Sequence, residues 1–283
     1  MSTMKFLFYA ERGEQVGLGH VRRCEALSLE FKKRGWEVDY SPGGKGPYDG
    51  IVIDSYVLAP EKIREYKKRC PFLIGFHDKG EPNANFSILI SSIYSETATR
   101  GRTRILGGHV YRAIHPDALA APPAAICDSI TSLVITFGGS AAMTVFTKEV
   151  AGALKKTLPA IGVRVVAGIS GKEAAAVFSS ADIAVAGGGQ TLLELAYLGV
   201  PTVVVSLSED QDAQIADAAA NGFARVAGKL HDARILDSIG ETVRSLYARD
   251  VRERMHDAGR GYIDGKGAER IADAVAHSFH ERI

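Results

Sequence analysis

The stretch AGGGQTLLELAYLGVPTVVV, residues 186–205, decides the fold class. It contains the end of an apolar run, three glycines, a helical segment and a second apolar run, TVVV. A strand, a tight glycine turn, a helix and another strand in this order are typical of a βαβ unit, whose two strands are parallel. The stretch therefore predicts a parallel sheet with helices on its faces.

The same alternation continues along the 283 residues of the chain. The sequence predicts strands at residues 5–9, 37–40, 51–55, 72–76, 87–90, 104–106, 133–137, 164–168, 183–186 and 202–206. Between and after them it predicts helices at residues 20–34, from Pro60 to about 69, and at 142–157, 173–179, 191–198, 212–221, 232–249, 250–259 and 267–283. This pattern predicts an α/β protein.

One segment interrupts the alternation. Residues 117–129, DALAAPPAAICDS, are rich in alanine and proline and have no clear periodicity, which predicts a linker. We therefore expect two Rossmann-like domains, residues 1–120 and 128–283, with parallel sheets facing across a cleft. The sequence leaves open whether the last helix, 267–283, packs back on the first domain.

Composition excludes several classes of protein. The net charge is +1, so no basic surface for nucleic acid is indicated. Cys24, Cys70 and Cys127 have neither metal-ligand spacing nor the even number of a disulfide framework. The first 15 residues have too short an apolar run for a signal peptide, no stretch approaches the roughly 20 apolar residues of a membrane span, and we find no acidic cluster suited to a metal. We expect a cytoplasmic protein without metal or cofactor.

Three glycine turns each follow a predicted strand: Gly17-Leu-Gly19-His20, Gly138-Gly139-Ser140 and Gly187-Gly188-Gly189-Gln190-Thr191. Such a turn lets a ligand approach the backbone, and the N–H groups at the start of the next helix favour an anion. The dinucleotide fingerprint is absent, because Arg22 stands where its third glycine would be. The Walker motif is absent too. A nicotinamide-dependent enzyme and an NTPase are thus disfavoured.

The third turn predicts a diphosphate site. Gly187, Gly188 and Gly189, with Gln190 and Thr191, could cradle the phosphates, and Glu194 lies one helical turn further on the same side as Thr191. A carboxylate there could accept hydrogen bonds from two ribose hydroxyls. The alternative is a tight structural turn followed by a solvated Glu194.

His20 is the candidate catalytic base. At a helix start the dipole disfavours the imidazolium, so the ring should be neutral and able to take a proton. The alternative is that His20 only caps its helix. Asp54, at the carboxyl end of a predicted strand, could orient His20, hold sugar hydroxyls or cap the turn at Tyr56. His77 could be oriented by the neighbouring Asp78.

The motifs resemble a known family. AGGGQTLLELAYLGVPT followed by SEDQDAQ resembles the nucleotide-sugar-binding half of GT-B-type proteins. Four further stretches, GLGHVRRCEAL, VIDSY, LGGHVYRAI and ITFGGS, resemble in the same order the UDP-2,4-diacetamido-2,4,6-trideoxy-β-L-altropyranose hydrolases of pseudaminic acid biosynthesis and related spore-coat polysaccharide proteins. The resemblance spans residues 4–225.

The resemblance implies a role for each matching residue. His20 matches the catalytic histidine, Glu194 the ribose-binding acid and Gln211 a glutamine near the sugar phosphate. The phosphate-facing loops match at Gly187 to Thr191 and at Gly138 and Gly139. The chain departs from the family at Tyr9-Ala10-Glu11 and at Asp210, both where sugar recognition is expected.

The leading hypothesis is metal-independent hydrolysis of a UDP-linked amino or deoxy sugar at its anomeric carbon, releasing UDP and the free sugar, with His20 activating water. The alternatives are an inverting GT-B glycosyltransferase, a nucleotide-sugar 2-epimerase and a catalytically idle nucleotide-sugar-binding partner of another enzyme. The sequence leaves the sugar, the base, the pathway and the oligomeric state open.

Overall fold

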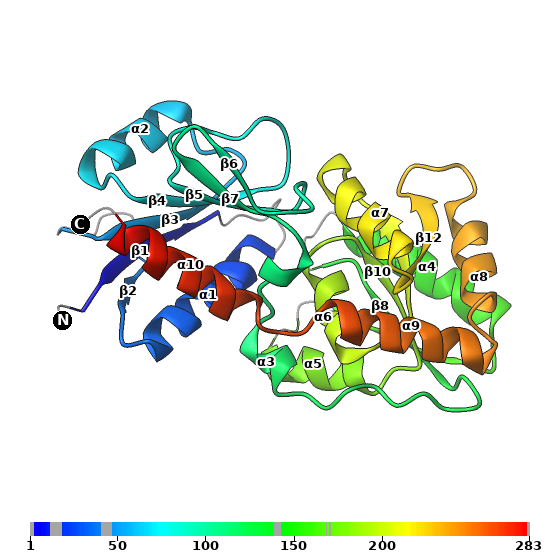
Figure 1. Cartoon of the computed structure of the whole chain (residues 1–283). Helices are drawn as coiled ribbons and strands as arrows, with labels where there is room; N and C mark the ends of the chain where they lie inside the picture. Colours follow the sequence, from blue (N-terminus) through cyan, green and yellow to red (C-terminus); the bar gives the residue numbers. More distant parts are fainter. Residues whose placement is uncertain are drawn as a thin grey trace. The chain divides into compact units, whose positions relative to one another are not determined.

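The computed structural model describes residues 3–11, 19–40, 47–138, 143–167, 169 and 171–281. They form two compact units (Figure 1). The first unit takes the described residues within 1–13, 20–113 and 265–283, and the second takes those within 14–19 and 114–264. Gly17 and Gly139, two of the glycines predicted to bind the ligand, lie outside the described residues.

The first unit contains a seven-stranded sheet in the order β2-β1-β3-β4-β5-β7-β6, parallel except for β6. Its strands are β1 (Lys5–Ala10), β2 (Glu37–Asp39), β3 (Gly50–Asp54), β4 (Leu73–His77), β5 (Ile88–Ser91), β6 (Ala98–Arg100) and β7 (Thr103–Leu106). Its helices are α1 (Gly19–Lys33), α2 (Pro60–Arg69), the 3-10 turn η1 (His109–Tyr111) and α10 (Gly267–His280).

The central strands of this sheet read as continuous apolar runs because both of their faces are buried. All five residues of β3 are buried, and Gly50 at its start leaves room for the ring of Phe6, which an added Cβ would approach to 2.5 Å. From β1 the chain goes first to β2 on one side and then to β3 on the other. The carboxyl ends of β1 and β3, where Ala10 pairs with Asp54, therefore flank a topological switch point.

The last helix, α10, belongs to the first unit (red in Figure 1). Ile271 and Val275 are fully buried in the core that β1, β3 and α1 share. Arg34, just after α1, donates from Nη1 to Asp273 Oδ1 at 2.6 Å. Gly267 allows the close approach to Arg112, because an added Cβ would overlap that residue's carbonyl oxygen. The chain thus returns to the unit in which it began.

The second unit contains a five-stranded parallel sheet in the order β12-β11-β10-β8-β9. Its strands are β8 (Ser132–Thr136), β9 (Gly162–Val165), β10 (Ile183–Gly187), β11 (Thr202–Ser206) and β12 (Ala224–Lys229). Its helices are α3 (Pro116–Leu119), α4 (Thr144–Thr157), α5 (Gly171–Ser179), α6 (Gln190–Leu198), the 3-10 turn η3 (Glu209–Gln211), α7 (Asp212–Ala220), α8 (Ile235–Arg244) and α9 (Arg249–Tyr262).

The switch point of this second sheet lies between β8 and β10, because β9 is added on one side of β8 and β10 on the other. Because β8 and β10 are adjacent and parallel, their carboxyl ends lie side by side there. The segment 117–129, expected as a linker, belongs to this unit. Ala124 is buried and donates its backbone N–H to the carbonyl of Leu198. Within the described parts of both units, no helix is both long and apolar enough to span a bilayer.

Candidate functional site

His20 and Asp54 form a buried hydrogen-bonded pair at the switch point of the first sheet. His20 lies in the first turn of α1, and Asp54 is the last residue of β3. Their exposed fractions are 8% and 1%, and the imidazole Nδ1 lies 2.5 Å from Asp54 Oδ1. Of the three arrangements that the sequence allowed for Asp54, the structure shows the contact with His20.

This geometry determines which imidazole nitrogen carries the proton. An ionised carboxylate can only accept, so Nδ1 must donate its hydrogen to Asp54. Arg23 Nη2 lies 3.3 Å from the same Nδ1, but its shorter contacts are with carboxylate oxygens. In the neutral ring Nε2 then carries a lone pair, and no hydrogen bond to Nε2 is found among the described residues. Nε2 is therefore the atom that can take a proton.

Three further residues complete this cluster: Arg23 was not named from the sequence, and Tyr56 and Asp78 were named only for other contacts. Arg23 grips Asp54 with two hydrogen bonds, from Nε to Oδ2 at 2.5 Å and from Nη2 to Oδ1 at 2.7 Å. Nη2 also lies 2.6 Å from Asp78 Oδ2, which accepts a hydrogen bond from the Tyr56 hydroxyl at 2.7 Å. The one available signal was the spacing of three residues between His20 and Arg23, which places both on one side of α1.

Burial and charge oppose each other in this cluster. Burial favours neutral Asp78, but the charge of Arg23 and hydrogen bonds from Arg23, Tyr56 and Ser92 outweigh it, so the pKa of Asp78 lies well below its ordinary value. Burial lowers the pKa of Arg23, but the nearby Asp54 and Asp78 raise it by more, so the pKa lies well above its ordinary value. Asp78 and Arg23 are therefore both charged at neutral pH.

His77 is not oriented by Asp78, contrary to one expectation from the sequence. Its Nε2 lies 3.1 Å from the carbonyl of Gly80, and its Nδ1 lies 3.2 Å from Ser91 Oγ. A carbonyl only accepts, so Nε2 carries the hydrogen and Nδ1 accepts from the serine. Both nitrogens are used within the protein, which makes His77 a structural histidine.

Glu11 also takes part in the local structure. It is 7% exposed, and its Oε2 accepts hydrogen bonds from Ser55 Oγ and from the backbone N–H of Tyr56, both at 2.9 Å. Glu11 rather than Asp54 thus holds the turn that follows β3. It departs from the family pattern at a position expected to contact sugar, yet one of its carboxylate oxygens is occupied by the protein itself.

In the second unit, two of the three glycines after β10 are required by packing. A Cβ on Gly187 would come within 2.6 Å of Leu207, and one on Gly188 would clash with Ile215. A Cβ on Gly189 would meet nothing closer than 3.8 Å. Gly189 is therefore the glycine of this loop whose backbone has room around it, and the tight-turn explanation applies to the other two.

Glutamine side chains hold this loop. Gln211 Oε1 accepts from the N–H groups of Gly188 and Leu207, at 2.9 and 3.3 Å. Gln214 Nε2 donates to the carbonyls of Gly188 and Gly189, at 2.6 and 3.0 Å. The N–H of Gly188, expected to face a phosphate, is thus bonded to Gln211, whose own expected place was near the sugar phosphate.

The other predicted residues of this unit lie around the same sheet edge. Gly189 precedes α6, Gln190 and Thr191 open it, and neither of these two is fully buried. Glu194 is 3% exposed, so it is not the solvated helix residue of the alternative interpretation. Gly138, after β8, has φ +85°, which strongly favours glycine. Asp210, in η3, is partly exposed and has no ion-pair partner among the described residues.

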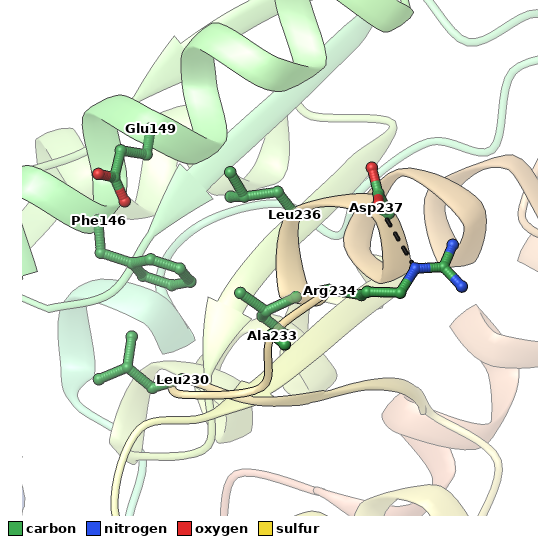
Figure 2. Close-up of a pocket in the computed structure, with 8 residues that line it drawn as sticks. Phe146, Glu149, Leu230, Ala233, Arg234, Leu236 and Asp237 are labelled. Atoms are coloured by element: carbon green, nitrogen blue, oxygen red, sulfur yellow. Dashed lines mark ion pairs between the residues drawn. The ribbon is translucent and has the colours of Figure 1, made fainter.

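A separate pocket lies in the second unit between the starts of α4 and α8 (Figure 2). Phe146, Leu230 and Leu236 contribute apolar surface, and Arg234 forms an ion pair of 3.5 Å with Asp237 at its rim. None of the residues predicted for the site lines this pocket. In the described ranges, no group of three or more histidine, cysteine or carboxylate side chains is placed to hold a metal ion.

Comparisons with known proteins agree with this architecture. No family model matches the chain. The chain is 22% identical to the spore coat polysaccharide biosynthesis protein SpsG of Bacillus subtilis over 336 aligned residues, which cover 97% of this chain and 98% of SpsG. The resemblance to spore-coat polysaccharide proteins is thereby confirmed.

Solved structures of low sequence identity share the fold. MurG of Acinetobacter baumannii is 13% identical with a TM-score of 0.62, and the match covers 98% of this chain and all of MurG. The spinosyn forosaminyltransferase SpnP is 12% identical with a TM-score of 0.64, and the match covers 97% of this chain and all of SpnP. The chain therefore has the fold of the GT-B glycosyltransferases and resembles SpsG along nearly its whole length.

Proposed function

We propose that this chain transfers a sugar from a nucleoside-diphosphate donor, with His20 as the general base. The observation that carries the proposal is the hydrogen bond from His20 Nδ1 to Asp54, which leaves Nε2 as the proton-accepting atom. An imidazole oriented by a buried carboxylate is a recurring arrangement for removing a proton from an attacking hydroxyl.

The reaction follows from these groups. His20 Nε2 takes the proton of an acceptor hydroxyl, whose oxygen bonds to the anomeric carbon while the bond from that carbon to the diphosphate breaks. A single displacement inverts the anomeric configuration. The departing diphosphate carries the negative charge away, and the backbone N–H groups and dipole at the start of α6 favour an anion there. Glu194, one turn inside α6, is proposed to accept from the ribose hydroxyls.

The acceptor distinguishes transfer from hydrolysis. The sequence motifs favoured water as the acceptor, but the solved structures with this fold include the rhamnosyltransferase SpnG, solved with thymidine diphosphate, and the forosaminyltransferase SpnP. These comparisons favour a glycosyltransferase, so we propose transfer as the main activity. Uridine and thymidine diphosphates are the donors to test first.

The first experiment measures release of nucleoside diphosphate from a panel of UDP- and TDP-sugars, with and without a mixture of sugar and polyol acceptors. Wild type is expected to release the diphosphate faster with an acceptor present. The His20→Ala variant should lose about 10²- to 10⁴-fold in rate, because the base is gone. The control is His277→Ala, which removes a histidine whose side chain is 65% exposed and should keep full activity.

Each outcome has a distinct meaning. Release that requires no acceptor but depends on His20 would replace transfer by hydrolysis. Binding of the diphosphate without turnover in any mixture, unchanged in His20→Ala, would establish a binding protein and overturn the proposal.

A pair of glycine substitutions tests the donor loop. Gly189→Ala should fold with nearly wild-type stability, because its Cβ meets no atom closer than 3.8 Å, but should bind nucleoside diphosphate at least about tenfold more weakly if the phosphate approaches this backbone. Gly188→Ala, the matched control, should lose about 1–3 kcal/mol of stability through its clash with Ile215. Urea unfolding and calorimetric titration measure both effects. Unchanged affinity in Gly189→Ala would show that the phosphate lies elsewhere.

A further inference from the structure

Five side chains of the first unit form a closed circuit of contacts. Asp54 accepts from His20 and Arg23, and Asp78 accepts from Arg23 and Tyr56. The ring of Tyr56 closes the circuit by packing edge-on against the imidazole of His20, with 4.5 Å between ring centroids. The circuit joins α1 to the carboxyl ends of β3 and β4, so each member is placed by two others.

Arg23 is the only cation of this circuit and pairs with both of its carboxylates, so it offsets one of their two negative charges. Its side chain is 17% exposed, and its guanidinium carbon lies over the ring of Phe76, in β4, 4.4 Å from the ring centroid. Asp54 and Asp78 are 1% and 8% exposed. Burial of two ionised carboxylates without this guanidinium would be strongly unfavourable.

We propose that Arg23 is a positioning residue for His20: it fixes Asp54 in the orientation that accepts Nδ1–H and offsets the negative charge that His20 would otherwise face. This inference rests on the proposed role of His20 as a base. Nearby negative charge favours the protonated form of a histidine, and a protonated imidazole cannot act as a base. With Arg23 in place, the imidazole is oriented by Asp54, a carboxylate that is already ion-paired with the guanidinium.

Other charged and titratable groups among the described residues also lie near the imidazole. Asp54, Arg23 and Asp78 act as described, and Cys24 stays a thiol because burial raises its pKa well above the ordinary value. Lys79 Nζ lies over the Tyr56 ring, 4.7 Å from its centroid, and Glu11 accepts a hydrogen bond from the backbone N–H of Tyr56. Of these groups, Arg23 and Asp78 differ in the sign of their effect on His20.

The sign difference gives a two-variant test by NMR titration of His20 in the full-length protein without substrate. Arg23→Gln removes a positive charge, so the His20 titration should move up by about 1 to 2 pH units. Asp78→Asn removes a negative charge, so it should move down by about half a unit. If Arg23→Gln fails to fold, Asp78→Asn still tests the coupling. Movement of both titrations in one direction, or of neither, would overturn the inference.

A conservative variant separates charge from positioning. Arg23→Lys keeps the charge but cannot form the two-pronged contact with Asp54, so the acidic limb of the kcat/KM profile should stay in place while kcat falls about tenfold or more. In Arg23→Gln the limb should instead move to higher pH, because the base must be unprotonated. The control is Arg34→Gln. Arg34 is also ion-paired, but it lies just beyond the end of α1, about 20 Å from His20 along the helix axis, where its charge is screened.

The titration and the activity can fail separately. If the His20 titration moves as expected but no nucleotide sugar is consumed, the coupling stands and the proposed function falls. If turnover depends on His20 but its titration moves in neither variant, the function stands and the coupling falls.

Discussion

Replacing Asp54 with asparagine is expected to lower kcat by about 10³- to 10⁴-fold while leaving donor binding nearly unchanged. The carboxylate accepts Nδ1–H of His20 at 2.5 Å and thereby keeps the lone pair on Nε2. An asparagine can place its NH₂ group against the ring instead, which favours the tautomer with hydrogen on Nε2. That tautomer cannot take a proton from a hydroxyl at this position.

The measurement is steady-state kinetics with the donor that wild type uses best, together with the Kd of the nucleoside diphosphate. Asp182→Asn is the matched control, because Asp182 is also buried but accepts its hydrogen bonds from Thr131 and Ser132. These contacts lie at the amino ends of β8 and β10, at the other end of the strands from the proposed donor loop. It should lower stability and leave kcat of the folded protein within about twofold. An Asp54→Asn variant with kcat within tenfold of wild type would remove Asp54 from the mechanism.

The fold class followed from the sequence because apolar runs, glycine turns and helical segments alternate regularly. The two strands that the sequence did not predict are edge strands. Strand β6 has three residues and runs antiparallel to β7. In β12, ARVAGK, only Ala224 is buried, and Val226 is the one residue with a strongly β-forming side chain. Neither strand shows the continuous apolar run of a central strand, since an edge is only partly buried.

The site was predictable where a residue stands at the end of an element and not where it depends on a distant partner. His20 and Asp54 were named because they stand at a helix start and at a strand end. Arg23 and Tyr56 could not be assigned to the same cluster, since their partner Asp78 reaches them only when β4 lies beside β3 in the sheet. No local sequence pattern predicts the order of the strands in the sheet.

The glycines show the opposite error. Three consecutive glycines suggested one continuous phosphate cradle, but Leu207 and Ile215 occupy the space that side chains at Gly187 and Gly188 would need. Both packing residues follow β11, some 20 residues later in the chain, so the sequence offers no cue to this contact. Of the three, Gly189 is the glycine for which we still propose a contact with the phosphate.

Substitution of Arg252 by methionine is expected to destabilise the second unit by about 3 kcal/mol. Arg252, in α9, is fully buried, and its guanidinium donates to the backbone carbonyls of Leu246, Cys127 and Asp128 at 3.0, 2.8 and 3.1 Å. No carboxylate of the described residues forms an ion pair with it. Arg252 thus ties the segment that enters β8 to the connection between α8 and α9, and methionine fills the volume without replacing any of the three hydrogen bonds.

The measurement is urea unfolding followed by far-UV circular dichroism, in which a loss of about 3 kcal/mol lowers the midpoint by about 1.5 M for a slope near 2 kcal/mol/M. The single tryptophan, Trp36, lies in the first unit, so its fluorescence reports that unit separately. The control Arg254→Met, two residues along α9, removes a guanidinium that is 68% exposed and ion-paired with Asp250, and should cost less than about 1 kcal/mol. Equal midpoints for the two variants would show that the buried guanidinium contributes no more to stability than the exposed one. A shift in the circular dichroism without an equal shift in the Trp36 signal would locate the loss in the second unit, because the three carbonyls that lose their donor all belong to it.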